Sequence, residues 1–205
     1  MKLRLQCASQ PICMGRSGCF KPYVCFGYFW IENETVLRMK PKSEPMLSIF
    51  PFQVEFKDAF FELNAEWLEA YFLIEPYDLK VLSNPQEMVL DRGGEIYFGA
   101  IEGEVVATFA RTPTAGDSIE LNKMAVRKDQ RGSGIGNQLM DYILKRCKAR
   151  GVCTLELYSN TRLQSALHLY RKYGFVEIPL PDDCVYDRAN IRMELSLSDA
   201  LGNGR

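Results

Sequence analysis

The sequence predicts an α/β domain, because strand-like runs and stretches with helical periodicity alternate from Ser48 onward. Three observations support this class. An apolar stripe recurs at helical spacing within residues 56–71, and two β-branched and aromatic runs within 95–111 are joined by a short turn. The third is the glycine-rich segment DQRGSGIGNQL, residues 129–139, which leads into a second amphipathic helix.

The first 45 residues differ in composition from the rest of the chain. They contain aromatic residues and cysteines without a strand or helix period, and they end in the proline-bearing KPKSEP. We predict that 1–45 is an irregular leader, disordered or dispensable, and that 46–205 is the domain. Four cysteines in the leader recur at intervals of six, which matches no common zinc-ligand spacing, so no metal site is expected. These four are Cys7, Cys13, Cys19 and Cys25.

Charge and hydropathy limit the partners. The chain has 25 basic and 26 acidic residues, a balance that gives no field for holding a nucleic acid or an anionic membrane. No run approaches the roughly 20 apolar residues that span a bilayer, and the N-terminus lacks the pattern of a signal peptide. We therefore expect a cytoplasmic protein without nucleic-acid or membrane partners.

The first half of the domain contains one predicted strand, two predicted helical pieces and a hairpin. Residues 47–52 form a strand, and residues 56–71 form a helix whose outer face carries Asp58, Glu62, Glu66 and Glu69. That acidic face is either a solvated surface or an attractor for a cationic substrate. A second helical piece follows over 78–90, with Asn84 and Pro85 suited to an N-cap and a first helical position. EIYFGAI and VVATFAR then form the hairpin.

The next strand, SIELNKMAV at 118–126, contains an irregularity. Its apolar positions Ile119 and Leu121 are out of phase with Met124 and Val126. Since a slip of one residue turns side chains to the other face of a sheet, the pattern predicts a β-bulge near Asn122 and Lys123.

The glycine-rich segment is expected to bind an anion. The helix that follows carries an apolar stripe at Ile135, Leu139, Ile143 and Cys147, and basic residues crowd its C-terminal end. Its N-terminus, at the glycines, is thus the positive end of the dipole, where phosphate binds to exposed amides. The dinucleotide pattern fails because Asn137 occupies its last glycine position, and the Walker pattern lacks its lysine. A turn without a ligand is the alternative.

The remaining elements follow in order. GVCTLELYSN at 151–160 is a strand entering a polar turn, and 161–173 is a helix ended by Gly174. FVEI begins another strand, and IRMELSL at 191–197 is expected to be an edge strand that could pair between two subunits.

These residues resemble the Gcn5-related N-acetyltransferase (GNAT) family. Its acyl-CoA motif, Q/R-x-x-G-x-G/A, is matched by Arg131, Gly134 and Gly136, and its later pattern by Asn160, Tyr170 and the YGF of 173–175. The likeness covers about residues 48–197. It implies a GNAT-like acyl-CoA N-acyltransferase fold, a mixed α/β domain with a central, mostly antiparallel sheet. The fourth and fifth strands of that sheet splay apart to admit the pantetheine arm.

The resemblance also implies a cofactor site for acetyl-CoA, used as acyl donor without a metal. The diphosphate would lie on the loop amides, assisted by Arg131 and by Arg127 or Lys128, and the pantetheine would pair with the strand at Met124 and Val126. The residues expected to bind the cofactor are Met124, Ala125, Val126, Arg131, Gly132, Ser133, Gly134, Ile135, Gly136, Asn137, Asn160 and Tyr173. For Asn160 the alternative role is that of a turn residue at the helix entry.

The implied reaction is transfer of an acetyl group to a primary amine by direct attack on the thioester. Tyr170 is the expected acid for the departing thiolate, or a core aromatic, and Glu120 is the candidate base, or a structural carboxylate. The acceptor is a small-molecule amine or a peptide amine, and a homodimer is possible. The alternative function is a non-catalytic acyl-CoA-binding module of the same fold.

Overall fold

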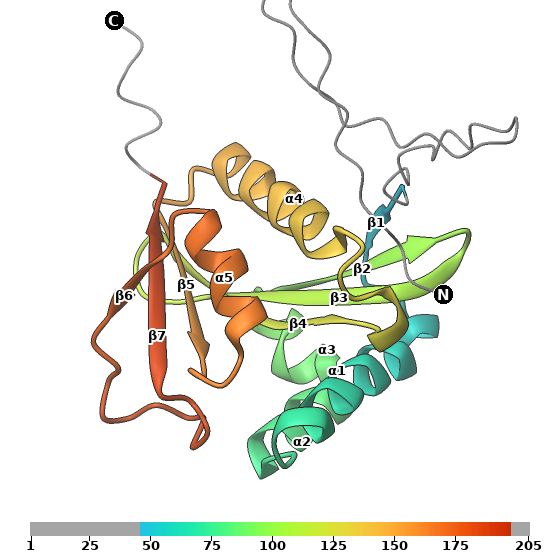
Figure 1. The fold of residues 1–205 in the computed structure, drawn as a ribbon, viewed down its shortest axis with the longest axis horizontal. Coiled ribbons are helices and arrows are strands. Elements are labelled where there is room, and N and C mark those ends of the chain that lie inside the picture. The colour runs from blue at the N-terminus through green and yellow to red at the C-terminus, as the bar shows by residue number, and fades with distance from the viewer. Residues whose placement is uncertain (1–45, 198–205) are drawn as a thin grey trace, which may run out of the picture. The chain divides into compact units, whose positions relative to one another are not determined.

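The computed structural model describes residues 46–197, and the predicted leader with its four cysteines lies outside the described residues. Its seven strands form one sheet in the order β1-β2-β3-β4-β5-β7-β6 (Figure 1). All neighbouring strands are antiparallel except β4 and β5. The strands are β1 (Ser48–Pro51), β2 (Glu95–Ile101), β3 (Glu104–Pro113), β4 (Ser118–Val126), β5 (Thr154–Ser159), β6 (Val176–Ile178) and β7 (Ile191–Ser196).

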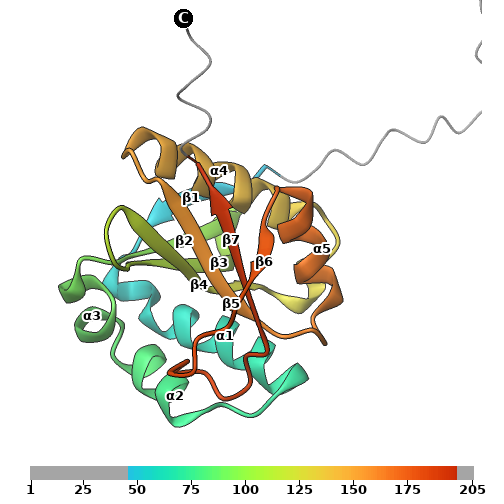
Figure 2. The same cartoon turned by 90° about the vertical axis from the view of Figure 1, so that its left-hand side faces the viewer.

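Helices cover both faces of the sheet. Figures 1 and 2 show α4 and α5 on one face and α1, α2 and α3 on the other. The helices are α1 (Lys57–Tyr71), α2 (Pro76–Ser83), α3 (Pro85–Met88), α4 (Ile135–Ala149) and α5 (Gln164–Lys172), with the short 3-10 helices η1 (Val54–Phe56), η2 (Leu90–Arg92) and η3 (Lys128–Gln130). Each face has its own buried cluster, one built around the α4 stripe and the other around Phe60 and Phe98. This architecture confirms the predicted fold class.

The predicted stripe of α4 is confirmed, since Ile135, Leu139, Ile143 and Cys147 are each at most 1% exposed. On α1 the stripe is incomplete, because Phe60 and Leu63 are buried whereas Tyr71 at the helix end is 37% exposed. Among the described residues, no helix has the length and apolar content needed to cross a membrane.

Two predictions about elements are wrong. The helical piece expected over 78–90 is two helices: α2 begins earlier, at Pro76, and α3 begins at Pro85 after Asn84. Asn84 and Pro85 do occupy the N-cap and the first position of α3, as predicted, but the Asn84 side chain makes no capping bond and donates back to the Lys80 carbonyl at 3.2 Å. The strand IRMELSL is not at an edge, because β7 pairs with β5 on one side and with β6 on the other. The interior position of β7 therefore excludes a homodimer that forms by pairing of this strand between two subunits.

The predicted bulge in β4 is confirmed. Thr108 pairs with Ala125 and Ala110 pairs with Asn122, so the register of β4 against β3 shifts by one residue between these pairs. Lys123 lies at the shift with a φ of 50°, a left-handed conformation that is uncommon for a residue with a side chain.

The predicted splay is also present. β4 pairs with β5 only from Ser118 to Glu120, although β4 continues to Val126. Beyond Glu120 the two strands have no ladder between them. The bulge and the splay thus occur together at the centre of the sheet.

Candidate active site

The glycine loop presents backbone donors at the N-terminus of α4. Gly132 and Gly134 have φ values of 79° and 88°, a conformation that favours glycine, and Gly134 is the N-cap. The amides from Gly132 to Gly136 donate to no acceptor within residues 46–197. The first turn of α4 carries no acidic side chain. Uncommitted amides at a positive helix end are suited to a phosphate group.

Most of the loop's cations are already paired. Arg131 donates through Nε to the Val126 carbonyl at 2.8 Å and through Nη2 to Glu66 Oε1 at 2.8 Å. Arg127 forms ion pairs with Asp129 and Glu104. The predicted assistance of these guanidinium groups to a diphosphate would therefore require them to share or exchange partners, whereas the amides are available as they stand.

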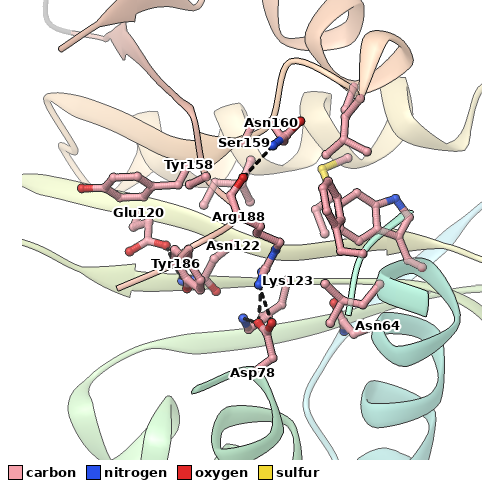
Figure 3. Close-up of a pocket in the computed structure, with 18 of the residues that line it drawn as sticks. Asn64, Asp78, Glu120, Asn122, Lys123, Tyr158, Ser159, Asn160, Tyr186 and Arg188 are labelled. Atoms are coloured by element: carbon pink, nitrogen blue, oxygen red, sulfur yellow. Dashed lines mark hydrogen bonds and ion pairs between the residues drawn. The ribbon is translucent and has the colours of Figure 1, made fainter. Parts of the chain in front are cut away.

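A cavity of about 110 Å³ lies where β4 and β5 separate (Figure 3). Four predicted site residues line it: Glu120, Met124, Asn160 and Tyr170. Helix α1 contributes Trp67 and Leu68, and the segment between β6 and β7 contributes Tyr186 and Arg188, to the same cavity. Predicted residues Ala125 and Val126 do not line it, and Ala125 is 2% exposed within the sheet. The predicted catalytic pair thus faces one space.

Tyr170 lies on α5 with its ring against Phe175, at 5.7 Å between centroids. Its hydroxyl has no hydrogen-bond partner in the described part of the chain. Burial raises the pKa of Tyr170 to about 12. The hydroxyl is therefore neutral near pH 7 and free to donate a proton into the cavity.

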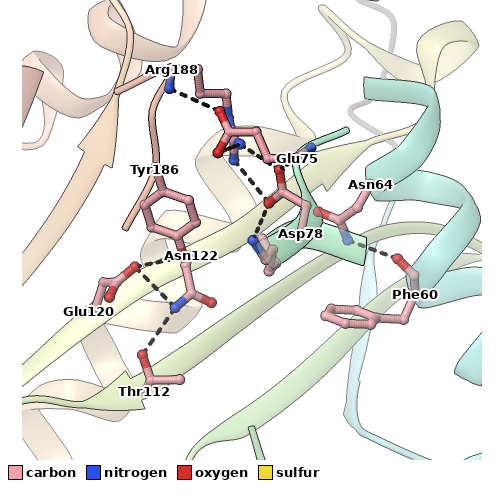
Figure 4. A network of polar contacts seen from close by, with 10 residues as sticks. Phe60, Asn64, Glu75, Asp78, Thr112, Glu120, Asn122, Tyr186 and Arg188 are labelled. Atoms are coloured by element: carbon pink, nitrogen blue, oxygen red, sulfur yellow. Dashed lines mark hydrogen bonds and ion pairs between the residues drawn. The ribbon is translucent and has the colours of Figure 1, made fainter. Parts of the chain in front are cut away.

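Glu120 lies in β4 immediately before the bulge. Its Oε1 accepts hydrogen bonds from Asn122 Nδ2 at 3.2 Å and from the Tyr186 hydroxyl at 3.5 Å (Figure 4). No Lys or Arg of residues 46–197 forms an ion pair with it. Desolvation raises the pKa of Glu120 above its ordinary 4.5. A carboxylate with a raised pKa is a better proton acceptor than one in water.

Asn160 and Tyr173 hold parts of the protein together. The Asn160 Nδ2 donates to the Arg188 carbonyl at 2.6 Å, and its Oδ1 accepts from the Arg162 amide at 2.8 Å (Figure 3). These are the bonds of a turn residue, the alternative that the sequence left open. The Tyr173 hydroxyl bonds to the Asn137 carbonyl and to Asp141, so it joins α5 to α4. Another loop residue, Ser133, donates to the Gln130 carbonyl at 2.6 Å.

Comparison with known proteins gives the family. The family model of the acetyltransferase (GNAT) domain matches residues 92–177, which include β2 to β5, the glycine loop, α4, α5 and the start of β6. Over these residues the chain is similar to the GNAT family. It is 28% identical over 104 residues to the uncharacterized N-acetyltransferase YvbK of Bacillus subtilis, covering 49% of this chain and 67% of that protein.

Other relatives agree with this assignment. The chain is 33% identical over 86 residues to the ribosomal protein bS18-alanine N-acetyltransferase of Escherichia coli, covering 41% of this chain and 58% of that enzyme. A GNAT acetyltransferase structure from Staphylococcus aureus superposes with a TM-score of 0.67 at 23% identity, covering 74% of this chain and 99% of that one. The PaiA N-acetyltransferase of Thermoplasma acidophilum, solved with coenzyme A, has a TM-score of 0.59 at 15% identity, with coverage of 74% and 99%.

The described domain contains a buried ionic cluster that the sequence did not predict (Figure 4). Asp78, in α2, is fully buried, and its carboxylate pairs with Lys123 Nζ at 2.7 Å and with both terminal nitrogens of Arg188. Glu75 pairs with the same Arg188 at 3.0 Å. The cluster therefore ties the β4 bulge to α2, and α2 to the segment before β7.

Tyr186 completes this cluster. It lies 8% exposed, with Lys123 Nζ 4.9 Å and the Arg188 guanidinium 5.1 Å from its ring centroid, and its hydroxyl reaches Glu120. For Lys123 the sequence did contain a local indication, since the apolar positions of β4 are out of phase on either side of it. Nothing in the spacing of Asp78, Tyr186 and Arg188 indicates that they meet, since they are 110 residues apart in the chain at the extremes.

Proposed function

We propose that this GNAT protein is an N-acetyltransferase that moves an acetyl group from acetyl-CoA to a primary amine by direct attack in a ternary complex. The main support for this proposal is the arrangement of the glycine loop, the splayed strands and the cavity. Five uncommitted amides at Gly132–Gly136 stand at the end of the splayed β4, and the same splay opens into the cavity that Glu120 and Tyr170 face. Binding of coenzyme A by the PaiA relative is in accord with this use of the loop.

The residues that would hold the donor have separate tasks. The amides of Gly132 to Gly136 would bind the diphosphate, because they lack protein acceptors and lie at the positive end of α4. The strand edge exposed beyond Glu120 would pair with the pantetheine amides at Met124 and Val126. Arg131 already bonds the Val126 carbonyl, so it would fix this edge as well as supply charge.

The chemistry joins the amine nitrogen to the acetyl carbon and breaks the carbon–sulfur bond of the thioester. Glu120 would take the proton that the amine loses, directly or through water, since its pKa is raised and no Lys or Arg of the described chain forms an ion pair with it. Tyr170 would give its proton to the departing sulfur, because its unpaired hydroxyl stays protonated near pH 7. The two groups are returned to their starting states by exchange with solvent. We further propose, from the composition alone, that the reaction takes place in the cytoplasm.

Titration calorimetry with acetyl-CoA tests the donor site. Gly134→Val should weaken binding by at least about tenfold, or about 1.4 kcal/mol, because its side chain blocks the approach to the amides. Gly151→Val is the matched control: Gly151 has a φ of 69°, so it imposes similar backbone strain at the other end of α4. Equal binding by both variants would contradict the assignment of the loop, and binding without acetylation of any amine would favour the non-catalytic module.

A further inference from the structure

A second cavity, of about 200 Å³, lies next to the first and is also lined by Glu120. The two cavities share the residues Glu120, Asn122, Lys123 and Tyr186. The second cavity is otherwise lined by the apolar groups Val81, Met88, Val89 and Pro113 and by Tyr77, Thr112 and Arg92. Tyr170 and Met124, which mark the expected donor side, line only the first cavity. The second cavity is thus placed to receive the acceptor.

Two of the charged groups that line this cavity, Glu120 and Arg92, have no ion-pair partner in the described chain. Lys123 is paired with Asp78, so its charge is neutralised inside the cluster. Glu120 has no cation within ion-pair distance, and Arg92 has no carboxylate within ion-pair distance, in the part of the chain that the structure describes. The one polar side-chain contact of Arg92 is Nη2 with Met88 Sδ at 3.5 Å, a weak acceptor. Glu120 and the exposed Arg92, neither of which has an ion-pair partner in the described chain, therefore line the same cavity.

The backbone that carries Arg92 is closely held. Gly93 has a φ of 78°, and the Gly94 amide donates to the Val89 carbonyl at 2.9 Å. A Cβ on Gly94 would lie 2.8 Å from that same carbonyl, so the turn depends on glycine for its close approach. The backbone position of Arg92 relative to Val89 is thus set by tight packing.

The acidic face of α1 is not part of either cavity. Asp58, Glu62, Glu66 and Glu69 are absent from both linings, and Glu66 instead contacts Arg131 and the Lys128 amide near the glycine loop. The acidic face of α1 therefore gives no support for a cationic acceptor in either cavity. Glu120 is a carboxylate that can receive one amino group of an acceptor in the second cavity. Arg92 would repel a second amino group on the same acceptor.

We propose that the second cavity is the acceptor subsite and that it selects a small monoamine carrying an acidic group, with Arg92 as the specificity-determining residue. The amine lies at Glu120, the carbon skeleton packs on Val81, Met88 and Val89, and the carboxylate or equivalent anion pairs with Arg92. This inference rests on the proposed acetyltransferase function. It names the class of acceptor as an amino acid or an amino acid-like zwitterion.

A matched series of acceptors tests this selection. Pentylamine, 1,5-diaminopentane and 5-aminopentanoate differ only in the group at the far end, and shorter and longer homologues of each scan the distance to Arg92. With the unmodified protein and acetyl-CoA, kcat/KM should be at least about tenfold higher for the best aminoalkanoate than for its alkylamine or diamine counterpart. In Arg92→Glu this order should reverse in favour of the diamine. Lys80→Glu makes the same charge change on an exposed residue outside both cavities and should keep the original order.

Equilibrium binding of the same compounds in the presence of coenzyme A separates the two hypotheses. If amines are acetylated without preference for the acidic series, the subsite is wrong and the acetyltransferase stands. If no amine is acetylated but the aminoalkanoate binds, and Arg92→Glu weakens that binding at least about tenfold, the subsite stands and the activity is wrong. Binding that is equal in Arg92→Glu and Lys80→Glu overturns the role of Arg92 in either case.

Discussion

Glu120 and Tyr170 face one cavity in surroundings that suit opposite proton transfers. Burial raises the pKa of Tyr170 to about 12, which keeps its hydroxyl protonated, and desolvation raises the pKa of Glu120 from 4.5. A raised pKa makes the carboxylate a stronger base. Two such groups on one cavity give an acid and a base from the environment of each.

Replacing Tyr170 with Phe removes the proposed acid and little else. We expect kcat to fall by about 10² or more with the affinity for acetyl-CoA retained, as loss of a general acid predicts. The free energy of unfolding should change little, because the hydroxyl has no protein partner to lose in the described chain. Tyr142→Phe, in a ring cluster with Tyr97 and Phe109 outside the cavities, is the control. Unchanged turnover would assign Tyr170 to packing alone.

Replacing Glu120 with Gln separates a base from a structural carboxylate. Because the folded state raises the pKa of Glu120, its contribution to stability is present below its ordinary pKa and lost as the pH rises through the folded value. Ionisation of Glu120 therefore opposes folding, and Gln should leave the Tm at pH 7 equal or higher. Activity should fall most at the acidic end of the pH profile, where the free amine is scarce. A lower Tm with an unchanged profile would instead indicate a structural role.

At the scale of elements, the bulge of β4 is stabilised by α2 and not by the sheet alone. Lys123 adopts a φ of 50° at the register shift, a conformation that costs of order 1 kcal/mol for a side-chain-bearing residue. Its ammonium is held by Asp78, which also binds Arg188. Burial opposes ionisation of Asp78, but the two cations hold the pKa of Asp78 below its usual value.

Asp78→Asn should therefore destabilise the domain by about 3–5 kcal/mol, because it leaves Lys123 and Arg188 buried without their anion. The measurement is urea unfolding, and the difference from the unmodified protein should shrink as the pH falls below about 4, where the depressed pKa of Asp78 is approached. The exposed pair of Arg171 and Glu177 gives the control, since Glu177→Gln should cost at most about 1 kcal/mol. A loss of that small size for Asp78→Asn would show that the cluster does not hold the bulge.

At the scale of the whole molecule, sequence predicts what short-range patterns encode. The α4 stripe, the hairpin and the bulge follow from periodicity, and the glycine loop from its motif. The interior position of β7 does not, because it depends on β6 pairing outside it over three residues. Likewise, the contact of Asp78 with Arg188 and the second cavity arise from segments that meet only after folding.

The predicted boundary at residue 46 gives the last test. Leu47 packs against the domain near the start of the described chain. Its amide donates to Gln138 Oε1 at 3.2 Å, and its side chain covers Gly99, where an added Cβ would lie 3.0 Å from Leu47 Cδ2. A chain that starts at Met46 should therefore unfold at the same urea concentration as the full chain and bind acetyl-CoA with a Kd within about twofold. A chain that starts at Phe52 loses Leu47 and all of β1, and it should be less stable by at least about 2 kcal/mol, the scale of removing one packed leucine. If the Met46 chain fails to fold while the full chain binds acetyl-CoA, residues 1–45 contribute to the domain and the boundary is wrong.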